Sequence, residues 1–293
     1  MRLGPFDTSE IKVRQGGSGR AAGGLGCGTI VIALIAAVVF GVDPSQTLQM
    51  LEGIQQQQSQ IGPTSTQTNV TADDLCNASA YANEACAALA SLNRTWEPVF
   101  ARNNLRFEQP ELVLYPSGPV TTRGCGNASS AAGPFYCPAD MGIYLDTTFF
   151  DQLARMSGAR ISGSQGNFAR LYVIGHEYGH HIQNITGINQ QIRAAQRANP
   201  QAANRMQVAM ELQADCLAGV WAGKNRDLLE AGDLEAGMMA ASSIGDDTLS
   251  QGSGRAINPE NFTHGSSQQR MEALRRGLES ANMAECNVYI QAI

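Results

Sequence analysis

The sequence lacks the features that mark a nucleic-acid-binding protein or a cysteine-based metal site. Only two of its 293 residues are lysine, no Lys/Arg cluster carries interleaved aromatic residues, and the formal net charge is −6. This composition argues against a basic surface, so we expect no nucleic-acid partner. The seven cysteines include no Cys-x-x-Cys pair, which disfavours a thiolate metal site. The chain has only four histidines, and three of them fall within six residues.

The first 42 residues are predicted to contain a membrane anchor. Residues 1–24 combine four basic residues with many glycines and are expected to form a disordered cytoplasmic tail. Residues 25–42 are apolar throughout, and about 18 residues are just enough to span a bilayer as one helix. Basic residues precede this run and none follows it until Arg94. The positive-inside bias therefore predicts a single-pass protein of the cytoplasmic membrane whose remaining chain lies outside, periplasmic or extracellular.

A cleaved signal peptide is the alternative interpretation of residues 25–42. No small-x-small cleavage site follows the apolar run, which favours an uncleaved anchor. Cys27 precedes the densely apolar part of the run, which begins at Ile30, whereas a lipid-modified cysteine would follow it, so we expect no lipidation there.

One globular domain is expected at residues 73–293, after a Gln/Ser/Thr-rich linker at residues 43–72. Hydrophobic periodicity predicts helices and strands along it. The expected helices cover residues 81–102, 147–157, 169–186, 204–223, 227–244 and 267–280, and the expected strands cover residues 111–115 and 141–146, with a loop at 116–134.

The segment His176-Glu-Tyr-Gly-His180 predicts half of a zinc site. On a helix, positions i and i+4 lie about 40° apart and about 6 Å along the axis, so both imidazoles can reach one ion. Glu177 lies one step further round the helix, where its carboxylate can take a proton from a zinc-bound water. The alternative is a pair of histidines held by hydrogen bonds in the core.

The third ligand is predicted to be Glu211. It lies on a helix of small and apolar residues, and Asp215 follows it at i+4, so both carboxylates face the same way. Two acidic side chains on a buried face are costly unless they are paired or bind a metal. If Glu211 is a metal ligand and Asp215 accepts a hydrogen bond from a ligand histidine N–H, the energetic cost of burying each carboxylate is offset. A solvated acidic face is the alternative.

Four motifs, in this order, resemble the bacterial family known as "putative neutral zinc metallopeptidases". They are Gly133-Pro-Phe-Tyr-Cys-Pro-Ala-Asp140, His176-Glu-Tyr-Gly-His180, Glu211-Leu-Gln-Ala-Asp215 and His264-Gly-Ser-Ser-Gln-Gln-Arg270. The likeness covers most of the chain. It implies an α+β, zincin-like fold, mainly helical with a small sheet rimming the cleft, and one Zn²⁺ per chain. It also implies a gluzincin-like ligand set, in which a Glu on a second helix is the third ligand.

The resemblance further assigns substrate binding to the strand before the metal-binding helix. Residues 140–146, including Tyr144, would rim the cleft and bind an extended peptide at the sheet edge. An ordinary core strand is the alternative.

Six cysteines follow the apolar run, and an even number outside the cytoplasm fits three disulfides out of fifteen possible pairings. By their positions relative to the motifs we favour Cys125 with Cys137 and Cys216 with Cys286. Cys76 and Cys86 remain, and in one continuous helix they would be about 15 Å apart. That pairing therefore requires a helix break between them.

A second group besides zinc is needed to stabilise the oxyanion of peptide hydrolysis, and His264 is the first choice. His181 should point about 100° away from His180 around the helix. Arg270 is expected to support His264, Asp215 or the substrate. A structural role for His264 at a helix start stays open, as do three rival donors, Tyr136, Tyr144 and Tyr178.

The predicted activity is zinc-dependent hydrolysis of peptides or unfolded proteins, with Glu177 as general base. Two other classes remain open. One is a zinc-site scaffold without turnover, for which Glu177 would have no use. The other is a hydrolase of cell-wall peptides, although no wall-binding repeat is recognisable.

Overall fold

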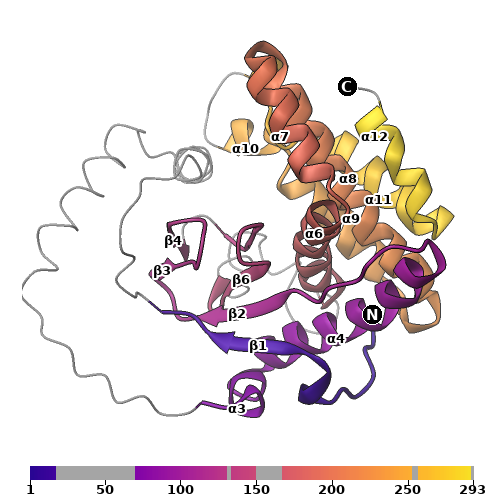
Figure 1. Ribbon diagram of the computed structural model, residues 1–293. Coiled ribbons are helices and arrows are strands. Elements are labelled where there is room, and N and C mark those ends of the chain that lie inside the picture. The colour runs from indigo at the N-terminus through magenta and orange to yellow at the C-terminus, as the bar shows by residue number, and fades with distance from the viewer. Residues whose placement is uncertain (18–69, 131–132, 150–166, 253–256, 292–293) are drawn as a thin grey trace, which may run out of the picture.

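The computed structural model describes residues 1–17, 70–130, 133–149, 167–252 and 257–291 (Figure 1). This part of the chain is α+β, mainly helical with a small sheet, as predicted. The predicted anchor at 25–42, nearly all of the linker at 43–72 and most of the helix expected at 147–157 lie outside the described residues. Among the described residues, no helix is long and apolar enough to cross a bilayer.

Most of the long helices form where hydrophobic periodicity predicts them. The longer helices are α4 (Ala80–Arg102), α6 (Asn167–Ile185), α7 (Ile188–Ala198), α8 (Ala203–Lys224), α9 (Asp233–Ser243) and α11 (Ser267–Ser280). The short ones are α3 (Ala72–Cys76), α10 (Asp246–Gly252) and α12 (Asn287–Gln291). A capping box between Ser266 and Gln269 starts α11, and Gly187, with φ of 81°, separates α6 from α7.

The main sheet has four strands in the order β1-β2-β6-β5. They are β1 (Lys12–Gln15), β2 (Glu111–Tyr115), β6 (Gly142–Asp146) and β5 (Phe135–Cys137). β1, β2 and β6 are parallel, whereas β5 runs antiparallel to β6. The predicted loop at 116–134 was only partly right, because β3 (Pro119–Thr121) and β4 (Asn127–Ser129) pair there as a small hairpin.

The expectation of a disordered tail is wrong for the first 17 residues. A 3-10 turn, Thr8–Glu10, leads into β1, which pairs with β2 in the register Val13↔Leu112. Composition misled here because backbone pairing with an existing strand can order a polar, Gly-containing segment that would not fold alone. The sheet thus includes residues outside the domain expected at 73–293.

The rim role expected for residues 140–146 is also wrong. β6 is paired with β2 on one side and with β5 on the other, so it has no free edge to bind a peptide. The Tyr144 ring is buried and stacks on Phe135 at 4.8 Å between ring centroids. Its hydroxyl donates to Asp140 at 2.5 Å and accepts from Arg14 at 2.7 Å. Tyr144 is therefore a sheet residue without a group free for substrate.

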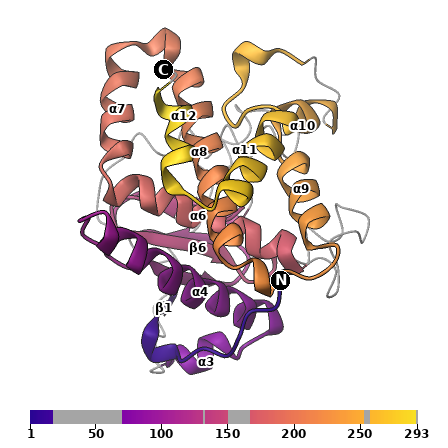
Figure 2. The same ribbon diagram turned by 90° about the vertical axis from the view of Figure 1, so that its right-hand side faces the viewer.

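The helices α6, α8, α9 and α11 gather beside the sheet, with α8 packed between α6 and α11 (Figures 1 and 2). Glycines allow the close approach of α8 and α11. A Cβ added at Gly277 would overlap the carbonyl oxygen of Cys216, and one at Gly219 would overlap that of Leu274. Backbone contact of this kind leaves no room for any side chain.

The three disulfides join the cysteines that we paired from the sequence. Cys125 bonds to Cys137, and Cys216 on α8 bonds to Cys286 near the end of the chain. Cys76 and Cys86 are bridged with their Cα atoms 5.9 Å apart, because a short non-helical segment separates α3 from α4. The break meets the condition that helix geometry set for this pairing.

We predict that Gly277→Ala destabilises the fold. The substitution gains about 1 kcal/mol in helix propensity, but overpacking against a backbone costs about 1–3 kcal/mol or more. We expect a melting temperature lower by about 2–8 °C, measured by circular dichroism. Gly252→Ala is the matched control, because no atom lies within 4 Å of a Cβ added there. An unchanged or higher melting temperature for Gly277→Ala would contradict this packing.

Candidate metal centre

Helices α6 and α8 bring two imidazoles and one carboxylate to a single point. Nε2 of His176 lies 3.2 Å from Oε2 of Glu211, and Nε2 of His180 lies 3.5 Å from the same oxygen. One ligand atom from each residue lies within 4.8 Å of the others. Tetrahedral ligands at about 2.0–2.1 Å from zinc are about 3.4 Å from one another. The three groups therefore stand at the spacing that a zinc ion requires.

The close crossing of α6 and α8 depends on a glycine inside the histidine motif. A Cβ added at Gly179 would lie 2.8 Å from both Cα and the carbonyl oxygen of Ala214. Real Cβ atoms essentially never approach so closely. The contact lies three residues from Glu211, so the glycine allows the carboxylate to reach the two rings.

Hydrogen bonds fix both histidines in the tautomer that binds a metal through Nε2. Nδ1 of His176 donates to Oδ1 of Asp215 at 2.7 Å. Nδ1 of His180 donates to Oε1 of Gln183 at 2.8 Å, and the Gln183 amide in turn donates to the Met210 carbonyl at 2.7 Å. With both Nδ1 protons used in this way, the Nε2 lone pairs face Glu211.

Asp215 accepts hydrogen bonds from two side chains besides His176. The Arg270 guanidinium donates twice, from Nε at 2.8 Å and from Nη2 at 2.9 Å, and the Tyr172 hydroxyl donates at 2.5 Å. Asp215 and Arg270 are both fully buried. Burial would raise the pKa of Asp215, but the charges of Arg270 and His176 outweigh it and lower that pKa to about 2. Asp215 therefore stays ionised and holds the His176 ring.

The charge of the buried cluster suits a divalent cation. Its carboxylates are Glu177, Glu211 and Asp215, and Arg270 is its one guanidinium. When both histidines are neutral, two negative charges remain uncompensated. Burial tends to lower the pKa of His176, yet Asp215 and Glu211 raise it to about 10. The negative charges that raise this pKa would also favour a metal cation, which competes with the proton for the same nitrogen.

Glu177 is buried beside the two rings, with 8% of its surface exposed. Burial raises the pKa of its carboxyl, and the neighbouring histidines oppose the rise. A raised pKa makes a carboxylate a stronger base, which suits a group that accepts a proton.

His264 lies near the cluster, at the start of the turn that leads into α11. Burial raises the pKa of the Glu211 carboxyl. His180, His176 and, with a smaller effect, His264 lower that pKa well below its usual range. Nδ1 of His264 lies 3.1 Å from Oδ1 of Asp246. Oδ2 of Asp246 accepts three backbone N–H groups, from Thr263 at 2.7 Å, His264 at 2.6 Å and Gly265 at 3.0 Å. Asp246 thus fixes both the loop and the imidazole.

The other candidates lie elsewhere or serve other contacts. His181 points away from the metal ligands, donating from Nε2 to the Glu108 carbonyl at 2.6 Å and accepting from the Tyr136 hydroxyl at 3.0 Å. The Tyr178 hydroxyl donates to Asn93 at 2.9 Å in the core. Neither tyrosine hydroxyl is placed in the cluster.

Four supporting residues escaped the sequence reasoning. Tyr172, which donates to Asp215, lies four positions before His176. Gln183 lies three positions after His180, and Gln207, which donates to Oε1 of Glu211 at 2.7 Å, lies four positions before its partner. Those spacings were a usable signal, since i, i+3 and i, i+4 neighbours meet on a helix. Asp246 gave no such signal, because it comes from a different segment.

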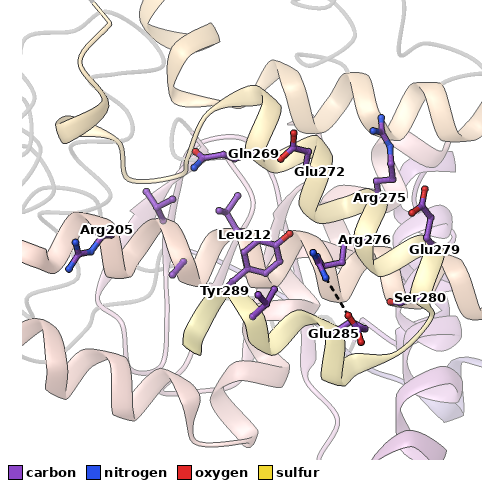
Figure 3. A pocket seen from close by; sticks show the side chains of 13 residues that line it. Arg205, Leu212, Gln269, Glu272, Arg275, Arg276, Glu279, Ser280, Glu285 and Tyr289 are labelled. Atoms are coloured by element: carbon purple, nitrogen blue, oxygen red, sulfur yellow. Dashed lines mark hydrogen bonds and ion pairs between the residues drawn. The ribbon is translucent and has the colours of Figure 1, made fainter. Parts of the chain in front are cut away.

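A separate groove of about 960 Å³ lies between α8, α11 and α12, and its lining includes none of the metal-binding residues (Figure 3). Arg276 and Glu285 form an ion pair at its wall, 3.3 Å apart. Three arginines and three glutamates line it. Its charges therefore balance, and they select no class of partner.

We predict that Gln183→Met weakens zinc binding about 10- to 100-fold, the usual effect of losing a group that orients a metal ligand. Zinc affinity of the metal-stripped protein, measured by competition with a chromogenic chelator, tests this. Gln190→Met is the matched control, because Gln190 bonds to Asn184 and to none of the ligands. Equal affinities for the two variants would show that Gln183 does not position His180.

Comparisons with known proteins identify the family of the chain. The chain matches the family model described as "Putative neutral zinc metallopeptidase" over residues 7–289. It is 39% identical over 285 residues to "Uncharacterized protein YpfJ" of Escherichia coli strain K12, covering 95% of this chain and 92% of that protein. It is 37% identical over 276 residues to "Uncharacterized protein Rv2575" of Mycobacterium tuberculosis strain H37Rv, covering 87% and 86%. No solved structure was found to match. The chain belongs to the putative neutral zinc metallopeptidase family.

Proposed function

We propose that the protein is a zinc-dependent peptidase that hydrolyses peptides or unfolded proteins outside the cytoplasm. The observation that carries the proposal is the meeting of His176, His180 and Glu211 at zinc-ligand spacing, with Glu177 buried next to them. A metal-binding scaffold would need the three ligands but not Glu177. The family description supports the same activity.

The proposal includes a zincin-like arrangement of the site. Two histidines on α6 and a glutamate on α8 would hold one Zn²⁺ per chain, and an antiparallel strand, β5, packs beside α6. When bound, zinc supplies Lewis acidity, which activates water and polarises the scissile carbonyl.

Glu177 is the general base in this proposal. Its carboxylate takes a proton from the attacking water and passes it to the leaving amine. Burial beside the rings keeps bulk water from weakening its basicity, consistent with its raised pKa. Asp215 and Arg270 do not touch the substrate, and they keep His176 in position.

His264 is the proposed donor to the oxyanion. Nδ1 donates to Asp246, so Nε2 points away from that carboxylate, and it donates to an oxyanion when both ring nitrogens carry a proton. Asp246 acts as a positioning residue, holding the ring as well as the loop that carries it.

Substrate backbone is proposed to bind along β5 rather than β6. Within the described sheet, β5 (Phe135–Cys137) is paired only with β6, which leaves its other edge for an extended peptide. The disulfide Cys125–Cys137 fixes the end of this strand. The three disulfides also favour a compartment outside the cytoplasm, because such bonds persist in oxidising surroundings.

We expect Glu177→Gln to keep zinc and to lose about 10²- to 10⁴-fold in turnover, since the amide cannot accept the proton. Elemental analysis measures the zinc content, and mass spectrometry identifies the products. The full chain is used because β1, which lies before residue 18, is part of the sheet. An unfolded protein and purified cell-wall peptides serve as parallel substrates. Glu272→Gln, an exposed change on α11, is the control. Full turnover by Glu177→Gln would refute the general-base role, and turnover of wall peptides alone would redirect the substrate class.

We expect His264→Ala to lower kcat about 10²- to 10³-fold with little change in KM, the usual cost of losing an oxyanion donor. Asp246→Asn should lower kcat less, because the amide oxygen can still accept from the three backbone N–H groups and its NH2 group can donate to Nδ1 of the ring. Steady-state kinetics on an unfolded protein measure both. A rise in KM with unchanged kcat would assign His264 to substrate binding instead.

A further inference from the structure

The first seventeen residues contact the rest of the domain along their whole length. β1 lies along β2 in parallel register, and its Arg14 makes an ion pair with Glu111 at 2.6 Å. Gly16 continues the pairing by donating to the Leu114 carbonyl at 2.8 Å. A Cβ at Gly16 would meet Val113 at 2.9 Å, so this backbone is packed against the sheet.

The beginning of the segment is held on a different part of the domain. The Met1 side chain is buried, and its amino group pairs with the buried carboxylate of Asp233 on α9. The backbone N–H of Arg2 donates to the Leu228 carbonyl at 2.7 Å. The segment therefore runs from α9 to the sheet (Figure 2).

Two further contacts fix the middle of the segment. The Thr8 hydroxyl donates to Asp73 at 2.6 Å, where α3 begins, and Glu10 pairs with Arg94 of α4 at 2.7 Å. The contacts thus involve α9, α3, α4 and β2, which lie far apart in sequence. Such a set forms only when residues 1–17 and the domain share one compartment.

We infer that residues 1–17 lie on the same side of the membrane as residues 70–291. An apolar run of about 18 residues crosses a bilayer once at most. A single crossing at residues 25–42 would put β1 and β2 on opposite sides, separated by a hydrocarbon core of about 30 Å. The inference replaces our expectation of a cytoplasmic tail, and it does not depend on the proposed peptidase activity.

Cross-linking in living cells tests the inference. The full chain carries Cys27→Ser, a protease site within residues 43–69, and the pair Thr8→Cys and Asp73→Cys, whose side chains touch. A short, membrane-permeant bis-maleimide cannot bridge a bilayer, and it reacts in either compartment. We expect the two fragments to stay joined on a denaturing gel after cleavage at the inserted site.

The matched control pairs Thr8→Cys with Arg193→Cys, an exposed position on α7 at the opposite end of the molecule from α3 in both views (Figures 1 and 2). This pair should not cross-link. Separation of the fragments in the Thr8/Asp73 variant would overturn the inference, and so would equal cross-linking of the two pairs.

Thiol labelling gives a second readout that does not require the cross-link. Single cysteines at Ser9 and Arg193, both exposed, are treated with a membrane-impermeant maleimide before and after the cytoplasmic membrane is opened. We expect both to react under the same condition. If one reacts only after opening and the other already before it, residues 1–17 lie across the membrane from the domain and the inference fails.

Discussion

The structure depends most on one buried carboxylate, Asp215. Its two oxygens accept from Tyr172 and His176 of α6 and from Arg270 of α11, so a single side chain of α8 ties three helices together. A buried charge is tolerated only when it is paired and hydrogen-bonded, and here each oxygen is satisfied. The same contacts that stabilise the helical layer also orient a metal ligand. Stability and function therefore rely on one set of bonds.

The candidate metal centre joins two packed helices, α6 and α8, to the loop that carries His264. Helices α6 and α8 are in backbone contact at Gly179, and the disulfide from Cys216 to Cys286 fixes α8 to the segment near the end of the chain. His264 instead stands on a turn whose three N–H groups are gathered by Asp246. A carboxylate that accepts several backbone donors can hold a loop nearly as firmly as a helix holds its own residues. The proposed chemistry needs the two helices and the loop at fixed spacing.

The amino-terminal segment shows where composition misleads. Glycines and scattered basic residues predict disorder, yet Arg14 and Glu10 find acidic or basic partners about one hundred residues away. The stabilisation of this segment comes from strand pairing with the edge of β2 and from ion pairs. The sequence of residues 1–17 contains no information about the edge of β2, so the pairing could not be predicted from these residues alone. Likewise, β5 is an edge strand of the described sheet because it pairs only with β6, whose other side pairs with β2.

By itself the sequence determined the features that depend on short spacings. These are most helix positions, the placing of His176 and His180 on one helix face, and that of Glu211 and Asp215 on another. The need for a helix break between Cys76 and Cys86 also followed from spacing alone. Helix periodicity and residue chemistry act over a few positions, so they can be read directly. Only the tertiary structure decided the place of β1, the order of the strands, the loss of a substrate role for Tyr144, and the pairing of Asp246 with His264. These depend on contacts between distant segments, whose formation is governed by packing of the whole chain rather than by any local preference.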